Sequence, residues 1–154
     1  MNSQHNTASI YVAVLGLITF VLGAADVLVW AGLTGGMDFG IMQIAGDDFF
    51  RWAWGGLVVA FAGILMIRGS RNIGEIPQYS EALLGAILVW MVAGCDIFAM
   101  ICENIPAGEE APEFLNSIGG FIGGFAPPYA PAVILLPFTL ALLYFYYVWG
   151  FAEE

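Results

Sequence analysis

The chain has 154 residues, of which 60% are hydrophobic and only 10% are charged. This composition lies outside the usual range of soluble domains and is typical of polytopic membrane proteins. Three basic residues face thirteen Asp and Glu residues, so the formal net charge is −10. So acidic a chain is not expected to bind nucleic acid by charge, and it favours cationic partners instead. We predict an all-α integral protein of the cell membrane, with residues 1–154 forming a single domain in the lipid bilayer.

The first half of the chain contains two apolar runs long enough to cross a hydrocarbon core. Residues 8–33 are predicted to form the first span, and a Thr-Gly-Gly cluster ends it. Residues 34–50 mix apolar side chains with glycines and aspartates, and we expect a short interfacial helix there. The second span is predicted at residues 49–67, with Asp47 and Asp48 as N-cap candidates.

A short polar link at residues 68–79 carries Arg68 and Arg71, two of the three basic residues. The positive-inside rule places this link in the cytoplasm, and both chain termini with it. The third span is predicted at residues 81–102 and the fourth at residues 131–151. Pro137 lies inside the fourth span and predicts a kink, because proline removes a helical hydrogen bond.

The connection between the last two spans, residues 103–130, is acidic at its start and then apolar and rich in glycine. Within it, residues 114–125 are too few to cross a bilayer as a helix. We expect a short interfacial or re-entrant helical segment, and a surface loop with an amphipathic turn is the alternative.

One pattern occurs twice, with three small residues followed by an aspartate deep inside an apolar run. The copies are Gly23-Ala24-Ala25-Asp26 and Ala93-Gly94-Cys95-Asp96. They align at an offset of about seventy residues, which suggests two tandem helix pairs related by an axis along the membrane normal. The alternative is a chance similarity, because Gly, Ala and Leu are abundant in this chain. That symmetry would bring both aspartates to one depth, and the small residues would let the first and third helices approach closely.

Asp26 and Asp96 are candidates for a proton or cation site, because an unpaired ionised carboxylate inside a membrane is costly. The alternative is a packing role, with each Asp hydrogen-bonded to a backbone carbonyl or a Trp N–H in a crowded bundle. Glu103 lies two turns beyond Asp96 and is either a stepping point for a cation or a helix-end charge in water. Arg51, at the outer end of the second span, could pair with either aspartate.

Glycines at helical spacing are expected to bring helix backbones together. These helix-packing candidates are Gly16, Gly23, Gly55, Gly56, Gly63, Gly85, Gly94, Gly119, Gly120, Gly123 and Gly124. The one histidine, His5, lies in a polar tail, and Cys95 and Cys102 suit apolar packing, so we expect no metal site and no cofactor. Apart from the two buried carboxyls, the sequence offers no base to activate a nucleophile, which argues against an enzyme.

Two functions remain from the sequence. The first is a small translocation unit for a proton, a cation or a small solute, forming a homo-oligomer because four helices barely enclose a pathway. The second is a non-catalytic structural or accessory subunit that assembles with other membrane subunits.

Overall fold

The computed structural model describes residues 3–103 and 118–148. Within these residues, four helical stretches are long and apolar enough to cross a membrane: His5–Trp30, Phe49–Asn72, Ile76–Cys102 and Pro131–Val148. The predicted four apolar helices are therefore confirmed. The first and third begin earlier than predicted, because their polar starts continue the helix instead of preceding it.

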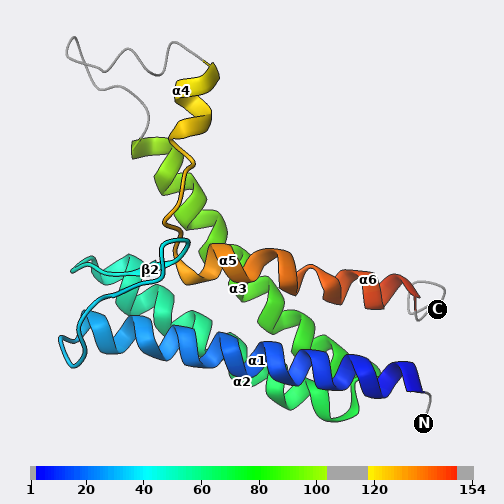
Figure 1. Cartoon of the computed structure of the whole chain (residues 1–154). Coiled ribbons are helices and arrows are strands. Elements are labelled where there is room, and N and C mark those ends of the chain that lie inside the picture. Colours follow the sequence, from blue (N-terminus) through cyan, green and yellow to red (C-terminus); the bar gives the residue numbers. More distant parts are fainter. Residues whose placement is uncertain (1–2, 104–117, 149–154) are drawn as a thin grey trace.

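Helix α1 (Ser3–Trp30) and helix α2 (Gly55–Gly69) lie side by side along much of their length (Figure 1). Glycines make this approach possible. A Cβ atom built on Gly23 would lie 2.3 Å from the Ala60 backbone nitrogen, and one built on Gly63 would lie 2.4 Å from that of Phe20. Any side chain at these two positions would therefore push the helices apart.

The second span opens with a π-helical turn, η1 (Phe49–Trp54), and closes with a 3₁₀ turn, η2 (Ser70–Asn72). Asp48 is the N-cap of η1, and its Oδ1 accepts a hydrogen bond of 2.7 Å from the Arg51 backbone N–H. The predicted capping role of Asp48 is thus confirmed.

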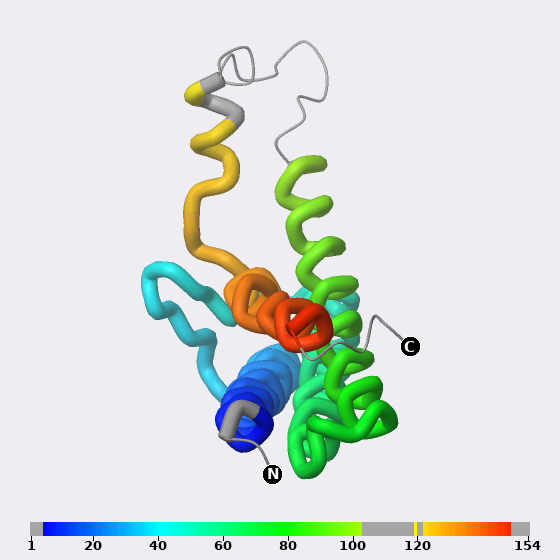
Figure 2. The backbone as a smooth tube through the Cα atoms, turned by 90° about the vertical axis from the view of Figure 1, so that its right-hand side faces the viewer, coloured from blue at the N-terminus to red at the C-terminus, as the bar shows by residue number. Residues whose placement is uncertain are grey.

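Helix α3 (Ile76–Glu103) crosses the other helices obliquely and extends beyond them. In Figure 2, α1 is seen nearly end-on, whereas α3 runs up the picture. Glycines again mark the contact with α2, since a Cβ on Gly85 would lie 2.6 Å from the Ala62 carbonyl oxygen, and one on Gly69 would lie 2.4 Å from that of Gln78. The C-terminal turns of α3 lie outside this contact.

The fourth span consists of two helices, α5 (Pro131–Thr139) and α6 (Ala141–Val148), that pack on α3. The interruption at Leu140 follows Pro137, whose missing N–H weakens the preceding turn, so the predicted irregularity takes the form of a break. Thr139 lies at this break, and its hydroxyl donates a 2.8 Å hydrogen bond to the Leu136 carbonyl.

A short β-hairpin follows α1, with strands β1 (Met37–Asp38) and β2 (Gln43–Ile44) paired antiparallel. The interfacial helix predicted for residues 34–50 is therefore wrong. Gly40 has φ +74° in the turn, a conformation that interrupts a helix and suits a hairpin. Met42 also forms a parallel bridge to Tyr129, which ties the hairpin to the segment before α5.

Helix α4 (Ile118–Gly123) lies in the connection between α3 and α5, of which residues 118–130 are described. Its six residues extend over about 9 Å, too short to cross a bilayer. A short helical segment is thus present in this connection, as predicted. Residues 104–117 of this connection and the predicted end of the fourth span at 149–151 lie outside the described residues.

The start of α1, η2 and the end of α6 gather at one end of the molecule, while the hairpin and η1 lie at the other (Figure 1). Hydrogen bonds hold the first end together, from the Ser9 hydroxyl to the Ser70 carbonyl and from the Tyr79 hydroxyl to the Leu142 carbonyl. The main core lies between the helices and includes fully buried Val12, Val59, Met66, Val89 and Leu142.

Candidate functional site

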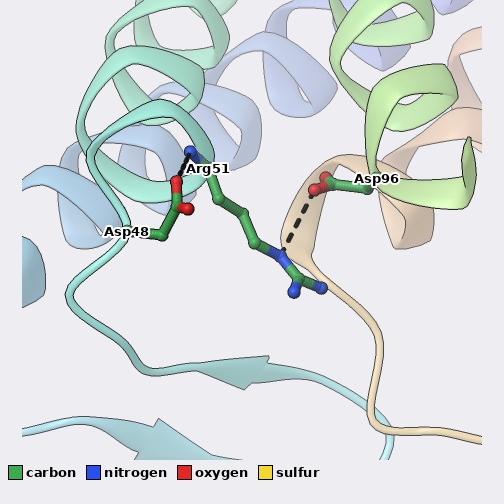
Figure 3. Close-up of polar contacts among 3 residues, drawn as sticks. All are labelled: Asp48, Arg51 and Asp96. Atoms are coloured by element: carbon green, nitrogen blue, oxygen red, sulfur yellow. Dashed lines mark hydrogen bonds and ion pairs between the residues drawn. The ribbon is translucent and has the colours of Figure 1, made fainter. Parts of the chain in front are cut away.

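Asp96 on α3 and Arg51 on η1 form an ion pair, with 3.4 Å between Arg51 Nε and Asp96 Oδ1 (Figure 3). The Asp96 side chain is 8% exposed and that of Arg51 is 30% exposed. Arg51 Nε has no hydrogen-bond partner in the described part of the chain, so the contact is electrostatic and not an aligned hydrogen bond. The structure therefore pairs Arg51 with Asp96, a choice between the two aspartates that the sequence left open.

Two further contacts hold Arg51 in place. Its backbone N–H is bound by the Asp48 carboxylate, which fixes the turn from which the side chain extends. Its guanidinium carbon lies 5.3 Å from the ring centroid of Trp52, within cation–π range. Trp52 is itself buried, so the arginine rests on a rigid ring.

Asp26 on α1 is buried, with 4% of its surface exposed. Its Oδ1 atom has no hydrogen-bond partner among the described residues. The carboxyl lies within electrostatic range of Asp96, so the charges of the two groups are coupled. An ionised carboxylate in this setting is poorly stabilised. Such a group either takes up a proton or needs a cation or a water molecule beside it.

Gly55 and Gly56, at the start of α2, lie between the two aspartate-bearing helices. A Cβ on Gly56 would lie 2.7 Å from Asp26 Cβ, whereas one on Gly55 would lie 3.5 Å from Val92 Cγ1 on α3. One glycine thus faces Asp26 and its neighbour faces the helix that carries Asp96. This narrow backbone is what allows the two carboxyls to come within range of each other.

A pocket of about 530 Å³ opens beside the Arg51–Asp96 pair. Its volume falls within the range of small-molecule sites in proteins, which is roughly 300–1,000 Å³. Acidic, aromatic and small residues from the hairpin end, η1 and α3 form its walls. The lining residues are Gly46, Asp47, Asp48, Phe50, Arg51, Trp52, Trp54, Gly55, Val92, Cys95, Asp96 and Ala99.

The two copies of the repeated pattern have different surroundings. Gly23 is pressed against α2, whereas a Cβ on Gly94 would meet nothing within 4 Å. Small residues therefore bring α1 against α2, and not against α3 as the repeat suggested. The two aspartates differ as well, since Asp96 has an arginine partner and lines the pocket while Asp26 is enclosed beside Gly56.

The other candidates fall into three groups. Gly16, Gly23, Gly56, Gly63 and Gly85 lie against neighbouring helices, and Gly55 makes an ordinary contact. Gly94, Gly119 and Gly123 have no atom within 4 Å of a built Cβ, Gly120 lies in α4, and Gly124 directly follows it. Glu103 ends α3, and its side chain lies outside the described part of the structure.

The described residues contain no group of three or more His, Cys, Asp or Glu side chains placed to hold a metal ion. Cys95 and Cys102 are both exposed, and Cys95 is part of the pocket lining. The sequence did not indicate the pocket, because its walls come from segments that are distant in the chain. The arginine at the start of the second span, Arg51, was the one available signal.

Comparison with known proteins gives no assignment: no family model, no curated protein and no solved structure matches this chain.

Proposed function

We propose that this protein is a small membrane translocation unit in which Asp26 and Asp96, together with Arg51, bind a proton or a small cation. The observation that carries the proposal is the charge imbalance of this trio. The Arg51 guanidinium pairs with the buried Asp96 carboxylate, and this ion pair stands beside an open pocket. The second buried carboxyl, Asp26, lies within electrostatic range of Asp96.

The net charge of Asp26, Asp96 and Arg51 determines which ligand the site would bind. With both carboxyls ionised, the trio carries one excess negative charge, which is costly in a low-dielectric setting. A single proton or monovalent cation removes that excess. Because Arg51 contacts Asp96, Asp26 is the group that remains without compensation, so we propose Asp26 as the proton-accepting residue and Asp96 as the residue that links it to the pocket.

Reconstituted liposomes with a pH-sensitive dye inside test this proposal. A proton gradient should dissipate faster with the wild-type protein than in empty liposomes, and Asp26→Asn should abolish the difference because the amide keeps the shape but cannot titrate. Asp38→Asn, which alters an exposed carboxylate of the hairpin, is the matched control and should keep wild-type flux. Equal flux with Asp26→Asn and the wild type would overturn the proposal.

A second candidate is the accessory subunit, and one observation favours it. The C-terminal turns of α3 extend beyond α1 and α2 (Figure 1). Phe98, in the last two turns of this helix, is 66% exposed. A projecting apolar surface suits a neighbouring membrane subunit. The native mass of the gently solubilised protein separates the candidates, since a translocation unit predicts a closed homo-oligomer and an accessory subunit predicts foreign chains.

A further inference from the structure

We propose that the pocket beside Arg51 and Asp96 binds a small zwitterion, a molecule that carries both an oxyanion and an ammonium group. This inference rests on the proposed function, because it names the class of solute that the Arg51–Asp96 site would bind in addition to the proton or cation. Three observations support it: the terminal nitrogens of Arg51, the exposed carboxylates of Asp47 and Asp48 in the pocket lining, and the aromatic side chains of the pocket walls.

Arg51 supplies the oxyanion contact. Its Nε faces Asp96, while the two terminal nitrogens point away from Asp96, as Figure 3 shows. No hydrogen bond or ion pair engages these terminal nitrogens within residues 3–103 and 118–148. Two adjacent N–H donors in a planar fork match a carboxylate or phosphate in a bidentate contact, and the Trp52 ring holds the fork in place.

The rim supplies the ammonium contact. Asp47 and Asp48 are exposed and line the pocket, so the lining has three carboxylates against one guanidinium. Among the described residues, neither rim carboxylate has an ion-pair partner, and the Asp48 carboxylate accepts a hydrogen bond only from the Arg51 backbone N–H. A purely anionic ligand would meet their repulsion, and a purely cationic ligand would leave the Arg51 donors without an acceptor. A zwitterion satisfies both ends at once.

The pocket walls and the pocket volume limit the size and polarity of the uncharged part of the ligand. Phe50, Trp54 and Val92 give the pocket an apolar surface, and its volume of about 530 Å³ leaves room for a side chain beyond the two charged groups. Such a ligand could be a free amino acid with an apolar side chain or the headgroup of a zwitterionic lipid. The two sources share the chemistry that the pocket would recognise.

Native Cys95 is a suitable reporter, because it is exposed and lines the pocket. In a Cys102→Ala background, held in discs of anionic phosphatidylglycerol, a water-soluble maleimide would label Cys95. Three compounds with the same apolar body form a matched set. Leucine carries both charges, 4-methylpentanoate carries only the anion, and isopentylamine carries only the cation. Leucine at ten times its dissociation constant should slow labelling about tenfold, because only the empty pocket reacts. The two single-charge analogues should have little effect.

Glycerophosphoethanolamine is the probe for the lipid source. Protection by this headgroup without protection by leucine supports a zwitterionic lipid as the ligand, and the reverse pattern supports a free amino acid. Equal protection by leucine and 4-methylpentanoate, or no protection by either zwitterion, overturns the proposal. Cys102, tested in a Cys95→Ala background, lies outside the pocket lining and should label at an unchanged rate.

Variants assign the two charged contacts. Arg51→Gln should remove protection, whereas Arg68→Gln should not, because Arg68 pairs with Glu81 and lies outside the pocket lining. If Arg51→Gln does not fold, Asp47→Asn tests the rim at an exposed position and should weaken protection by the zwitterion. Protection needs no gradient, so a wild-type protein that shows protection but no proton flux contradicts the proposed function alone. A wild-type protein that shows proton flux but no protection contradicts this inference alone.

Discussion

Arg51 and Asp96 connect the start of the second span to the C-terminal part of the third, with 3.4 Å between Nε and Oδ1. The pair joins two elements that also meet through Gly55 and Val92. Because Asp96 is the more buried partner, the arginine compensates a carboxylate that has little access to water. Loss of the arginine and loss of the aspartate should therefore have unequal effects.

Arg51→Gln should lower the free energy of unfolding at pH 8, since it leaves the Asp96 carboxylate buried without its cation. The loss should fall below the roughly 3–5 kcal/mol seen when fully buried pairs are broken, because Arg51 is 30% exposed. Thermal unfolding in detergent measures it. At pH 5 the deficit should shrink, because the carboxyl can then escape the penalty by binding a proton. An additional Asp96→Asn change should restore most of the lost stability, and an equal deficit at both pH values would count against a charged Asp96.

Gly23→Ala and Gly94→Ala are a matched pair from the two copies of the repeated pattern. At Gly23 the new methyl group would lie 2.3 Å from the Ala60 nitrogen, so α1 and α2 must separate. The expected cost is about 1–3 kcal/mol. At Gly94 nothing lies within 4 Å, so the same change should be neutral or stabilise by up to about 1 kcal/mol through helix propensity. Unfolding in a denaturing detergent compares them, and similar losses would show that both copies pack closely.

The four long helices could be predicted because uninterrupted apolar runs leave a chain in lipid few alternatives. The cap at Asp48 and the disturbance after Pro137 could also be predicted, since each depends on local backbone chemistry. These features are set by residues that are neighbours in the chain.

The features that could not be predicted depend on contacts between distant segments. The hairpin was missed because Met37 and Ile44 among glycines suit an interfacial helix equally well, and its bridge to Tyr129 is invisible in the local pattern. The choice of Asp96 as the partner of Arg51 also required the crossing of α3 over the other helices. The repeated pattern predicted equivalent surroundings for Gly23 and Gly94, which the structure does not show.

The break in the fourth span makes a further prediction. Thr139 Oγ1 accepts a 2.8 Å hydrogen bond from Trp90 Nε1 on α3, so Thr139→Val leaves a half-buried indole N–H without its acceptor. A loss of about 1 kcal/mol is expected, close to what such bonds contribute in membrane proteins. Thermal unfolding measures it. Adding Trp90→Phe removes the orphaned donor, so the double variant should lose less than the sum of the single changes. Strict additivity would mean that the hydrogen bond contributes nothing.

The arrangement of the two ends predicts the topology in a membrane. Exposed Asn72 belongs to η2, at the end shared with the start of α1 and the end of α6, whereas Ile41 is 65% exposed in the hairpin at the other end. Single cysteines at these positions, in a background without Cys95 and Cys102, should react with an impermeant maleimide from opposite sides. We expect Ile41→Cys to label in intact cells and Asn72→Cys only after permeabilisation, because the arginines near η2 favour the cytoplasm. Labelling of both in intact cells would overturn the four-span arrangement, and the opposite order would reverse the predicted orientation while keeping the fold.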